Sequence, residues 1–327
     1  DKIILLTCNK LEQKLDNAIY LNDLARYFAV KTFWEIPLLH FAQNNPQVKL
    51  VVTNINFALP KKDPDFEKNL LGINQLRRMI ATDQNAVKKT VFDKLGYSNS
   101  EVKELLTDAH VKTNADGSAS MVDNESPLWR IINGKRETAC QPDNYKNKIY
   151  FIGTCHFFGI NAPYDKTIES YLQKMLNDDN LPYRVENEGQ HFVLRFQDIF
   201  YNLNKLDCKA GDIIFVLSHF KLIDLPILEL KNPFEGCDYR EIFPYRGHVN
   251  EVGYKILAEK YFNYLTENDF FNHTNFEYPP SHLYRIVMVY RRKIFQSKNR
   301  LQKNFSTNRN WKITGKGCVS DDLKSVA

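Results

Sequence analysis

An apolar run at residues 149–152 that ends in a Gly-Thr-Cys-His turn most constrains the fold of this chain. A short apolar run bounded by a glycine is typical of a strand that is buried in a parallel sheet. When such a strand runs into glycine and a small polar residue, an α/β fold presents one side chain at the sheet edge, where its ligands bind. The side chain presented here is that of Cys155, and a second glycine follows at Gly159.

Strands and helices alternate through residues 128–275. The predicted elements are strands at 149–152, 184–186 and 213–217 and helices at 165–177, 192–203 and 250–265. Because strands that alternate with helices form βαβ units, this pattern predicts an α/β fold with a parallel, doubly wound sheet.

The chain before this domain is predicted to be a separate region of unknown role, residues 1–112. It begins as a small α/β unit and continues as charged helices, and its elements are a strand at 3–6, a helical stretch at 11–41, a strand at 48–53 and helices between 59 and 108. Ser98 or Asn99 is the expected N-cap of the last helix. Residues 114–125 are rich in Gly, Ser, Asp and Asn, so 113–127 is predicted to be a linker.

The composition is that of a globular cytoplasmic protein. Hydrophobic residues make up 43% of the 327 residues, and the six cysteines include no Cys-x-x-Cys pair. Scattered cysteines of this kind fit reduced thiols. No run approaches the about 18 apolar residues that a membrane span needs, and no secretory leader opens the sequence. No nucleotide-binding glycine motif is present, and we expect no cofactor and no metal.

The C-terminal tail, residues 276–327, is basic. Ten Lys and Arg residues lie between 285 and 316 with no acidic residue among them. Mixed with aromatic and aliphatic residues, these cations favour contact with an anionic membrane at the inner membrane face or with a phosphate-bearing glycan carrier. The alternative is a solvated basic helix with a loose end. No nucleic-acid motif accompanies the charge, so no nucleic-acid partner is expected.

Two stretches resemble sequence blocks of the SGNH, or GDSL-like, hydrolase superfamily. FIGTCHFFG at 151–159 resembles the first block, in which a strand runs into Gly-Asp-Ser; Cys155 stands at the position of the nucleophilic serine and Thr154 replaces the aspartate. VENEG at 185–189 resembles the second block. The resemblance implies that the Gly189 amide contributes to an oxyanion hole.

Two later stretches resemble the third and closing blocks. DIIFVLSHF at 212–220 places Ser218 and His219 where the family has Gly-x-Asn-Asp, so the usual oxyanion asparagine is missing. GHVNEVGY at 247–254 resembles the closing block, with His248 at the catalytic histidine and Tyr245 at the family's aspartate. The resemblance covers roughly residues 145–265, and residues 133–176 also resemble a subgroup associated with bacterial surface-polysaccharide loci that often carries cysteine after the first glycine.

The resemblance implies a flavodoxin-like, three-layer α/β/α fold and an acyltransferase or esterase that acts on a sugar or capsule polysaccharide precursor. The expected partners are this carbohydrate and, for a transferase, an acyl donor. The expected site residues are catalytic Cys155 and His248, oxyanion-hole residues His156, Gly189 and Ser218, and substrate-binding residues Thr154, His219 and Asn250. The competing hypothesis is a catalytically inactive glycan-binding or scaffold module.

The chemistry also follows from the residues themselves. A thiol near a helix N-terminus is favoured as thiolate, and a neighbouring imidazole takes its proton. Cys155 would then attack an acyl carbonyl, with His248 as general base and then general acid, while the amides of Cys155 or His156 and of Gly189 hold the oxyanion. Asp238, Glu241 and Glu251 are the carboxylates near enough in sequence to orient the imidazole.

Three simpler interpretations remain open. Cys155 packs as a buried structural cysteine, or His248 only helps to begin the helix that Asn250 caps. In the third interpretation, zinc is held by four residues that would converge at the sheet edge, namely Cys155, His156, His219 and His248.

Overall fold

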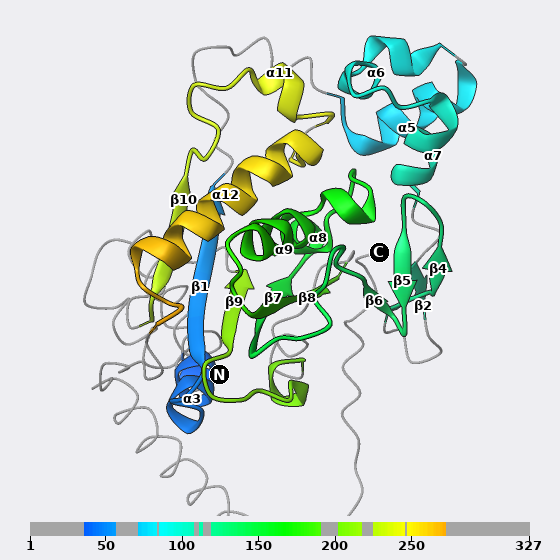
Figure 1. The fold of residues 1–327 in the computed structure, drawn as a ribbon. Helices are drawn as coiled ribbons and strands as arrows, with labels where there is room; N and C mark the ends of the chain where they lie inside the picture. The colour runs from blue at the N-terminus through cyan, green and yellow to red at the C-terminus, as the bar shows by residue number, and fades with distance from the viewer. Residues whose placement is uncertain are drawn as a thin grey trace, which may run out of the picture. The chain divides into compact units, whose positions relative to one another are not determined.

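A five-stranded parallel sheet lies at the centre of the structure (Figure 1). The computed structural model describes residues 36–56, 71–83, 85–107, 111–113, 119–190, 202–217, 225–245 and 247–272. Across the sheet, the strands are β10 (Ile227–Lys231), β1 (Lys49–Asn56), β9 (Ile213–Leu217), β7 (Asn147–Gly153) and β8 (Tyr183–Gly189). Every pair of neighbouring strands is parallel. The predicted α/β class and parallel sheet are confirmed.

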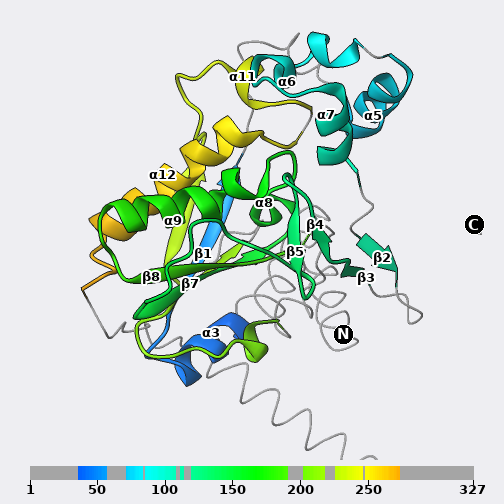
Figure 2. The same cartoon turned by 45° about the vertical axis from the view of Figure 1, so that its right-hand side comes forward.

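Helices cover both faces of this sheet (Figure 2). Helices α9 (Ile168–Asp178) and α12 (Glu251–Glu267) pack on one face, and α3 (Ile36–Asn44) packs on the other. Side chains alternate along a strand, so Phe151 of β7 joins the first core and Tyr150 joins the second. This arrangement is compatible with a three-layer α/β/α fold.

Strand β1 corrects the predicted domain division. It pairs with β9 on one side and β10 on the other, so residues assigned to a separate N-terminal region lie inside the main sheet. Numbered by their order in the chain, the five strands from β8 to β10 read 3-2-4-1-5 across the sheet, because β1 comes first in the chain but lies in the fourth place. All of the described residues belong to one compact unit, Asp1–Pro279. The boundary predicted near residue 112 is therefore wrong.

A helical segment before residue 108 packs against residues that follow β7 in the chain. Its elements are α5 (Ile73–Thr82), η2 (Ala86–Lys89), α6 (Val91–Lys94) and α7 (Asn99–Leu105). Ser98 caps α7, as one of the two predictions had it, because its hydroxyl accepts from the Glu101 amide while the Glu101 carboxylate accepts from the Ser98 amide. Apolar side chains of this segment share a core with Trp129 and Phe158.

The predicted linker contains strands. Strands β2 (Val111–Thr113) and β3 (Ala119–Met121) form an antiparallel pair, and β4 (Asn124–Glu125), β5 (Arg130–Ile132) and β6 (Lys135–Arg136) form a small sheet. The turn between β5 and β6 is Asn133-Gly134, with φ of 53° and 74°. Asn-Gly is the dipeptide that a two-residue hairpin turn of this kind favours. Within the predicted linker, residues 113–127, strands β3 and β4 form regular secondary structure that the composition did not predict.

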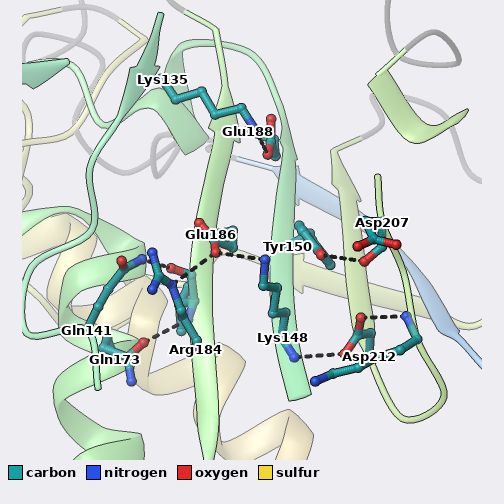
Figure 3. Close-up of polar contacts among 12 residues, drawn as sticks. Lys135, Gln141, Lys148, Tyr150, Gln173, Arg184, Glu186, Glu188, Asp207 and Asp212 are labelled. Atoms are coloured by element: carbon teal, nitrogen blue, oxygen red, sulfur yellow. Dashed lines mark hydrogen bonds and ion pairs between the residues drawn. The ribbon is translucent and has the colours of Figure 1, made fainter. Parts of the chain in front are cut away.

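Glutamine side chains protect the edge strand β8, and the polar contacts around it are drawn in Figure 3. Gln173 of α9 accepts from the Val185 amide at 2.7 Å and donates to the Tyr183 carbonyl at 3.0 Å, and Gln141 donates to the Val185 carbonyl at 2.7 Å. These contacts satisfy backbone groups that an edge strand would otherwise offer to another chain. They also fix β8 against α9.

Several predictions fall outside the described residues. These are the strand at 3–6, most of the helices at 11–41 and 192–203, and the basic tail at 276–327. Within the part of the chain that the structure describes, no helix has both the length and the apolar character needed to cross a membrane.

We predict that a fragment beginning at residue 113 will not fold cooperatively. Such a fragment lacks β1, so β9 and β10 lose their common neighbour and apolar side chains such as Val51, which is fully buried, are missing from the core. Urea unfolding followed by far-UV circular dichroism would show this. A fragment that begins at residue 36 is the control, and a cooperative transition of the shorter fragment would contradict the shared sheet.

Candidate active site

Cys155 lies where the sequence predicts it, at the carboxyl end of a central strand. Helix α8 (Cys155–Phe158) begins directly after β7, and Thr154 precedes it in an extended conformation. The Thr154 carbonyl accepts from the amides of Phe157 and Phe158, each at 3.0 Å. The Cys155 side chain is half-buried and its thiol is free, not in a disulfide.

The His248 imidazole contacts the Cys155 thiol. The distance from His248 Nε2 to Cys155 Sγ is 3.1 Å. This hydrogen bond joins two residues that are far apart in the sequence, one at the end of β7 and the other just before α12. A nucleophile and a base within hydrogen-bonding distance are the geometric signature of nucleophilic catalysis.

Aromatic packing sets the plane of the His248 ring. Its centroid lies 5.2 Å from the ring of His156 and 5.3 Å from the ring of Tyr245. Tyr245 also forms a backbone bridge with His248. The residue at the family's aspartate position therefore supports the histidine through its ring and its backbone, and not through a carboxylate.

Asn161 connects the loop after α8 to both sides of His248. Its Oδ1 accepts from the Tyr245 hydroxyl at 2.8 Å, and its Nδ2 donates to the Val249 carbonyl at 3.3 Å. The side chain is buried. Because one amide group binds the residues on either side of His248, it fixes that segment relative to the loop that follows Cys155.

The three carboxylates expected to orient His248 are engaged elsewhere. Asp238 caps helix α11 (Tyr239–Ile242) and Glu241 pairs with Lys94 at 3.2 Å. Glu251, the first residue of α12, pairs with Lys166 at 2.8 Å and accepts from the Tyr97 hydroxyl. Glu241 therefore ties α11 to α6 (Val91–Lys94), and Glu251 ties α12 to the segment before α7.

Burial raises the pKa of the Cys155 thiol. The hydrogen bond between Sγ and the Thr154 hydroxyl, 3.9 Å long, and the backbone amides of His156 and Cys155 lower this pKa, but their effects are smaller than that of burial. The expectation of a thiolate is therefore wrong for this state. Helix α8 is a single short turn, so its dipole is small, and desolvation of the charged form dominates.

The two predicted oxyanion donors that the structure describes differ in their surroundings. The amide of His156 lies near the Cys155 sulfur, where it favours the charged form. The Gly189 amide instead donates to Asn187 Oδ1 at 2.9 Å, and Asn187 Nδ2 donates to the Phe157 carbonyl at 2.7 Å. The end of β8 is thus attached to α8, while the Gly189 amide is occupied by Asn187.

Asn250 has a structural task and not the predicted contact with substrate. It is fully buried, its Oδ1 accepts from the amides of Val252 and Gly253, and its Nδ2 donates to the Glu241 carbonyl at 2.7 Å. Thr154 is half-buried beside the sulfur. Ser218 and His219 follow β9 directly and lie outside the described residues.

No group of three or more His, Cys, Asp or Glu residues in the described ranges is arranged to hold a metal ion. The zinc interpretation also requires His219, which lies outside those ranges. Within the described part of the site, Cys155 and His248 contact each other as a pair.

Sequence reasoning missed Asn161 and Asn187, the two amide side chains that join the elements of the site. Asn187 lies inside the second block, but nothing in its surroundings predicts a bond to the Phe157 carbonyl. Asn161 has φ of 70°, a conformation that asparagine adopts more readily than most residues. A turn residue in FFGINAP was the available signal.

Comparisons with models of known protein families, with curated proteins and with solved structures find no match to this chain.

We predict that the alkylation rate of Cys155, relative to that of the exposed Cys140, increases with pH. Because burial raises the Cys155 pKa, its thiolate forms only at higher pH than that of an ordinary cysteine. Iodoacetamide labelling at several pH values, read by peptide mass spectrometry, measures this ratio. A ratio that is highest near neutral pH and falls as the pH rises would indicate a preformed thiolate instead.

We predict that Gly189→Ala destabilises the protein by about 1–3 kcal/mol, the usual cost of overpacking. A Cβ at this position would lie 2.3 Å from the Phe158 nitrogen and 2.5 Å from the Phe157 carbonyl carbon, so the backbone of α8 must move. Urea unfolding measures the loss. Gly236→Ala is the control, because nothing lies within 4 Å of its added Cβ, although its φ of 83° carries a strain cost of its own. Equal losses in the two variants would count against the close approach.

Proposed function

We propose that this chain is an SGNH-like enzyme that transfers or removes an acyl group on a sugar or surface-polysaccharide precursor, with Cys155 as nucleophile. The observation that supports the proposal is the 3.1 Å hydrogen bond between Cys155 Sγ and His248 Nε2 at the carboxyl edge of a parallel sheet. In open α/β sheets, ligands bind at this edge, where neighbouring connections leave over opposite faces.

In the proposed reaction, the Cys155 sulfur attacks the acyl carbonyl while His248 Nε2 takes the thiol proton. The tetrahedral intermediate collapses to a thioester, and His248 returns the proton to the leaving alcohol. Water or an acceptor hydroxyl then attacks the thioester, losing its proton to His248. The sulfur leaves and regains that proton, which restores the thiol and the neutral imidazole.

The raised pKa of Cys155 suits this sequence of proton transfers. A thiol that is protonated at rest needs a base in contact with it, and His248 is in contact. The amides of Cys155 and His156, which favour negative charge on the sulfur, are the candidate donors to the oxyanion. In this mechanism the rings of His156 and Tyr245 hold the orientation of the His248 imidazole.

The substrate class follows from the sequence resemblance. The subgroup associated with bacterial surface-polysaccharide loci suggests a glycan or glycan-precursor acceptor, an acyl donor if the reaction is a transfer, and a cytoplasmic site near the inner membrane face. The basic residues between 285 and 316 would suit contact with an anionic membrane there.

A second candidate function is a catalytically inactive glycan-binding or scaffold module. The occupied Gly189 amide and the engagement of Asp238, Glu241 and Glu251 elsewhere favour this alternative. Under this alternative, the thiol and imidazole would be remnants of an ancestral site. Activity measurements separate the two functions.

We predict that the protein hydrolyses or transfers acyl groups from acyl esters and acyl thioesters, and that Cys155→Ala abolishes the reaction. His248→Ala should lower kcat by roughly 10²–10⁴-fold, the usual contribution of a general base. Incubating the wild type with an acyl thioester should leave an acyl group on Cys155, detectable by mass spectrometry of the intact protein and of its peptides.

Two matched controls test whether the losses are specific. Cys208→Ala removes another partly buried thiol whose pKa is raised by burial, to about 12, and His40→Ala removes an exposed histidine on α3. Both should keep wild-type turnover. Wild-type protein without turnover or acyl adduct on such substrates, but with measurable glycan binding, would favour the scaffold alternative.

A further inference from the structure

One buried arginine donates hydrogen bonds to the backbone of the loop that follows α8. Arg136 ends strand β6 and is 1% exposed. Its Nη1 donates to the Phe158 carbonyl at 2.8 Å and to the Gly159 carbonyl, and its Nη2 donates to the Ala162 carbonyl at 2.6 Å. The planar guanidinium thus binds three carbonyls of one short loop, a geometry that the single ammonium of lysine does not reproduce.

Aromatic rings enclose the same guanidinium. Its central carbon lies 4.1 Å from the centroid of the Trp129 ring and 5.3 Å from that of Phe158, and these two rings are stacked on each other. Within the described residues, no carboxylate forms an ion pair with Arg136. Burial lowers the Arg136 pKa to about 9, which still leaves it charged at neutral pH.

A buried cation without an ion pair is costly. The carbonyl contacts of Nη1 and Nη2 and the ring contacts offset that cost only while the loop keeps its shape, and Nε is buried without a hydrogen-bond partner.

The loop that Arg136 holds also holds Cys155. The Gly159 amide donates to the Cys155 carbonyl at 3.0 Å, and the Ile160 amide donates to the same oxygen at 3.3 Å. Gly159 has φ of 75°, and a Cβ there would lie 2.5 Å from Thr167 Cγ2, so no side chain fits. The path from the guanidinium to the backbone of Cys155 therefore passes through a single residue.

We infer that Arg136 is a positioning residue for the nucleophile: through the carbonyls of Phe158, Gly159 and Ala162 it holds the α8 turn so that Cys155 Sγ stays in contact with His248 Nε2. This inference rests on the proposed function for its effect on turnover, but its effect on the placement of the thiol can be measured without any substrate. The Cys155 and His248 side chains carry the chemistry, and Arg136 acts only through them.

The test compares Arg136→Lys and Arg136→Met with wild type. If the turn loosens, the Cys155 thiol becomes more exposed and less desolvated, so the pH dependence of its alkylation relative to Cys140 should flatten. If the protein is an enzyme, kcat should fall on the order of 10²-fold with little change in KM, as expected for a displacement of about 1 Å. Lysine should restore part of both properties because it keeps the charge.

Leu176→Ala is the matched control for a purely structural effect. Leu176 is fully buried on α9 and its loss should lower the melting temperature without changing the alkylation profile. An Arg136→Met variant that melts lower but keeps the wild-type alkylation profile would overturn the inference. Turnover that survives Cys155→Ala would instead overturn the proposed function. The alkylation profiles of the Arg136 variants would still test whether Arg136 positions the thiol.

Hydrogen exchange on the wild type covers the case in which both arginine variants fail to fold. The amides of Gly159 and Ile160 should exchange only through openings close in free energy to global unfolding, because the hydrogen bonds from Arg136 to the loop carbonyls fix both residues. Exchange as fast as that of an exposed turn would show that Arg136 does not hold the loop, and would overturn the inference.

Discussion

Strand β7 pairs with β8 on one side and with β9 on the other, and its side chains are buried on both faces of the sheet. A strand in this position cannot slip by one residue without exchanging the two cores, because successive side chains point to opposite faces. Its carboxyl end is therefore fixed in space. Cys155 follows that end directly, so the pairing of β7 determines where the thiol is presented.

Buried polar side chains join the elements around the thiol. Asn187 attaches the end of β8 to α8, and Asn161 attaches the following loop to the two sides of His248. Arg136 binds the backbone carbonyls of the same loop. Each of these buried groups would be costly if it lost its partners, so the network favours one arrangement of α8, its loop and His248.

This arrangement brings a thiol and an imidazole together. The three carboxylates that lie nearby in sequence, those of Asp238, Glu241 and Glu251, make their contacts elsewhere. Tyr245 occupies the position where the superfamily that the sequence resembles has aspartate, and its ring packs on His248 while its hydroxyl binds Asn161. A protonated thiol suits this environment, because burial disfavours the charged form of Cys155. Proton transfer in the proposed reaction would therefore accompany attack and not precede it.

The sequence by itself determined the features that depend on neighbouring residues. Apolar runs predicted β7, β8 and β9, and the predicted bounds of β9, residues 213–217, are those of the structure. The local capping pattern predicted Ser98 or Asn99 as a helix cap, and the structure has Ser98. The sequence also singled out Cys155 and His248, since each follows or precedes an element with a recognisable boundary. Only the tertiary structure decided the rest, because those contacts join distant residues.

Three sets of contacts leave no periodic or local pattern in the chain. They are the pairing of β1 with β9 and β10, the ion pair of Glu251 with Lys166, and the hydrogen bonds of Asn161 and Arg136 near Cys155. Parallel pairing and side-chain contacts across the core depend on which segments fold against one another. Local propensities do not specify that choice.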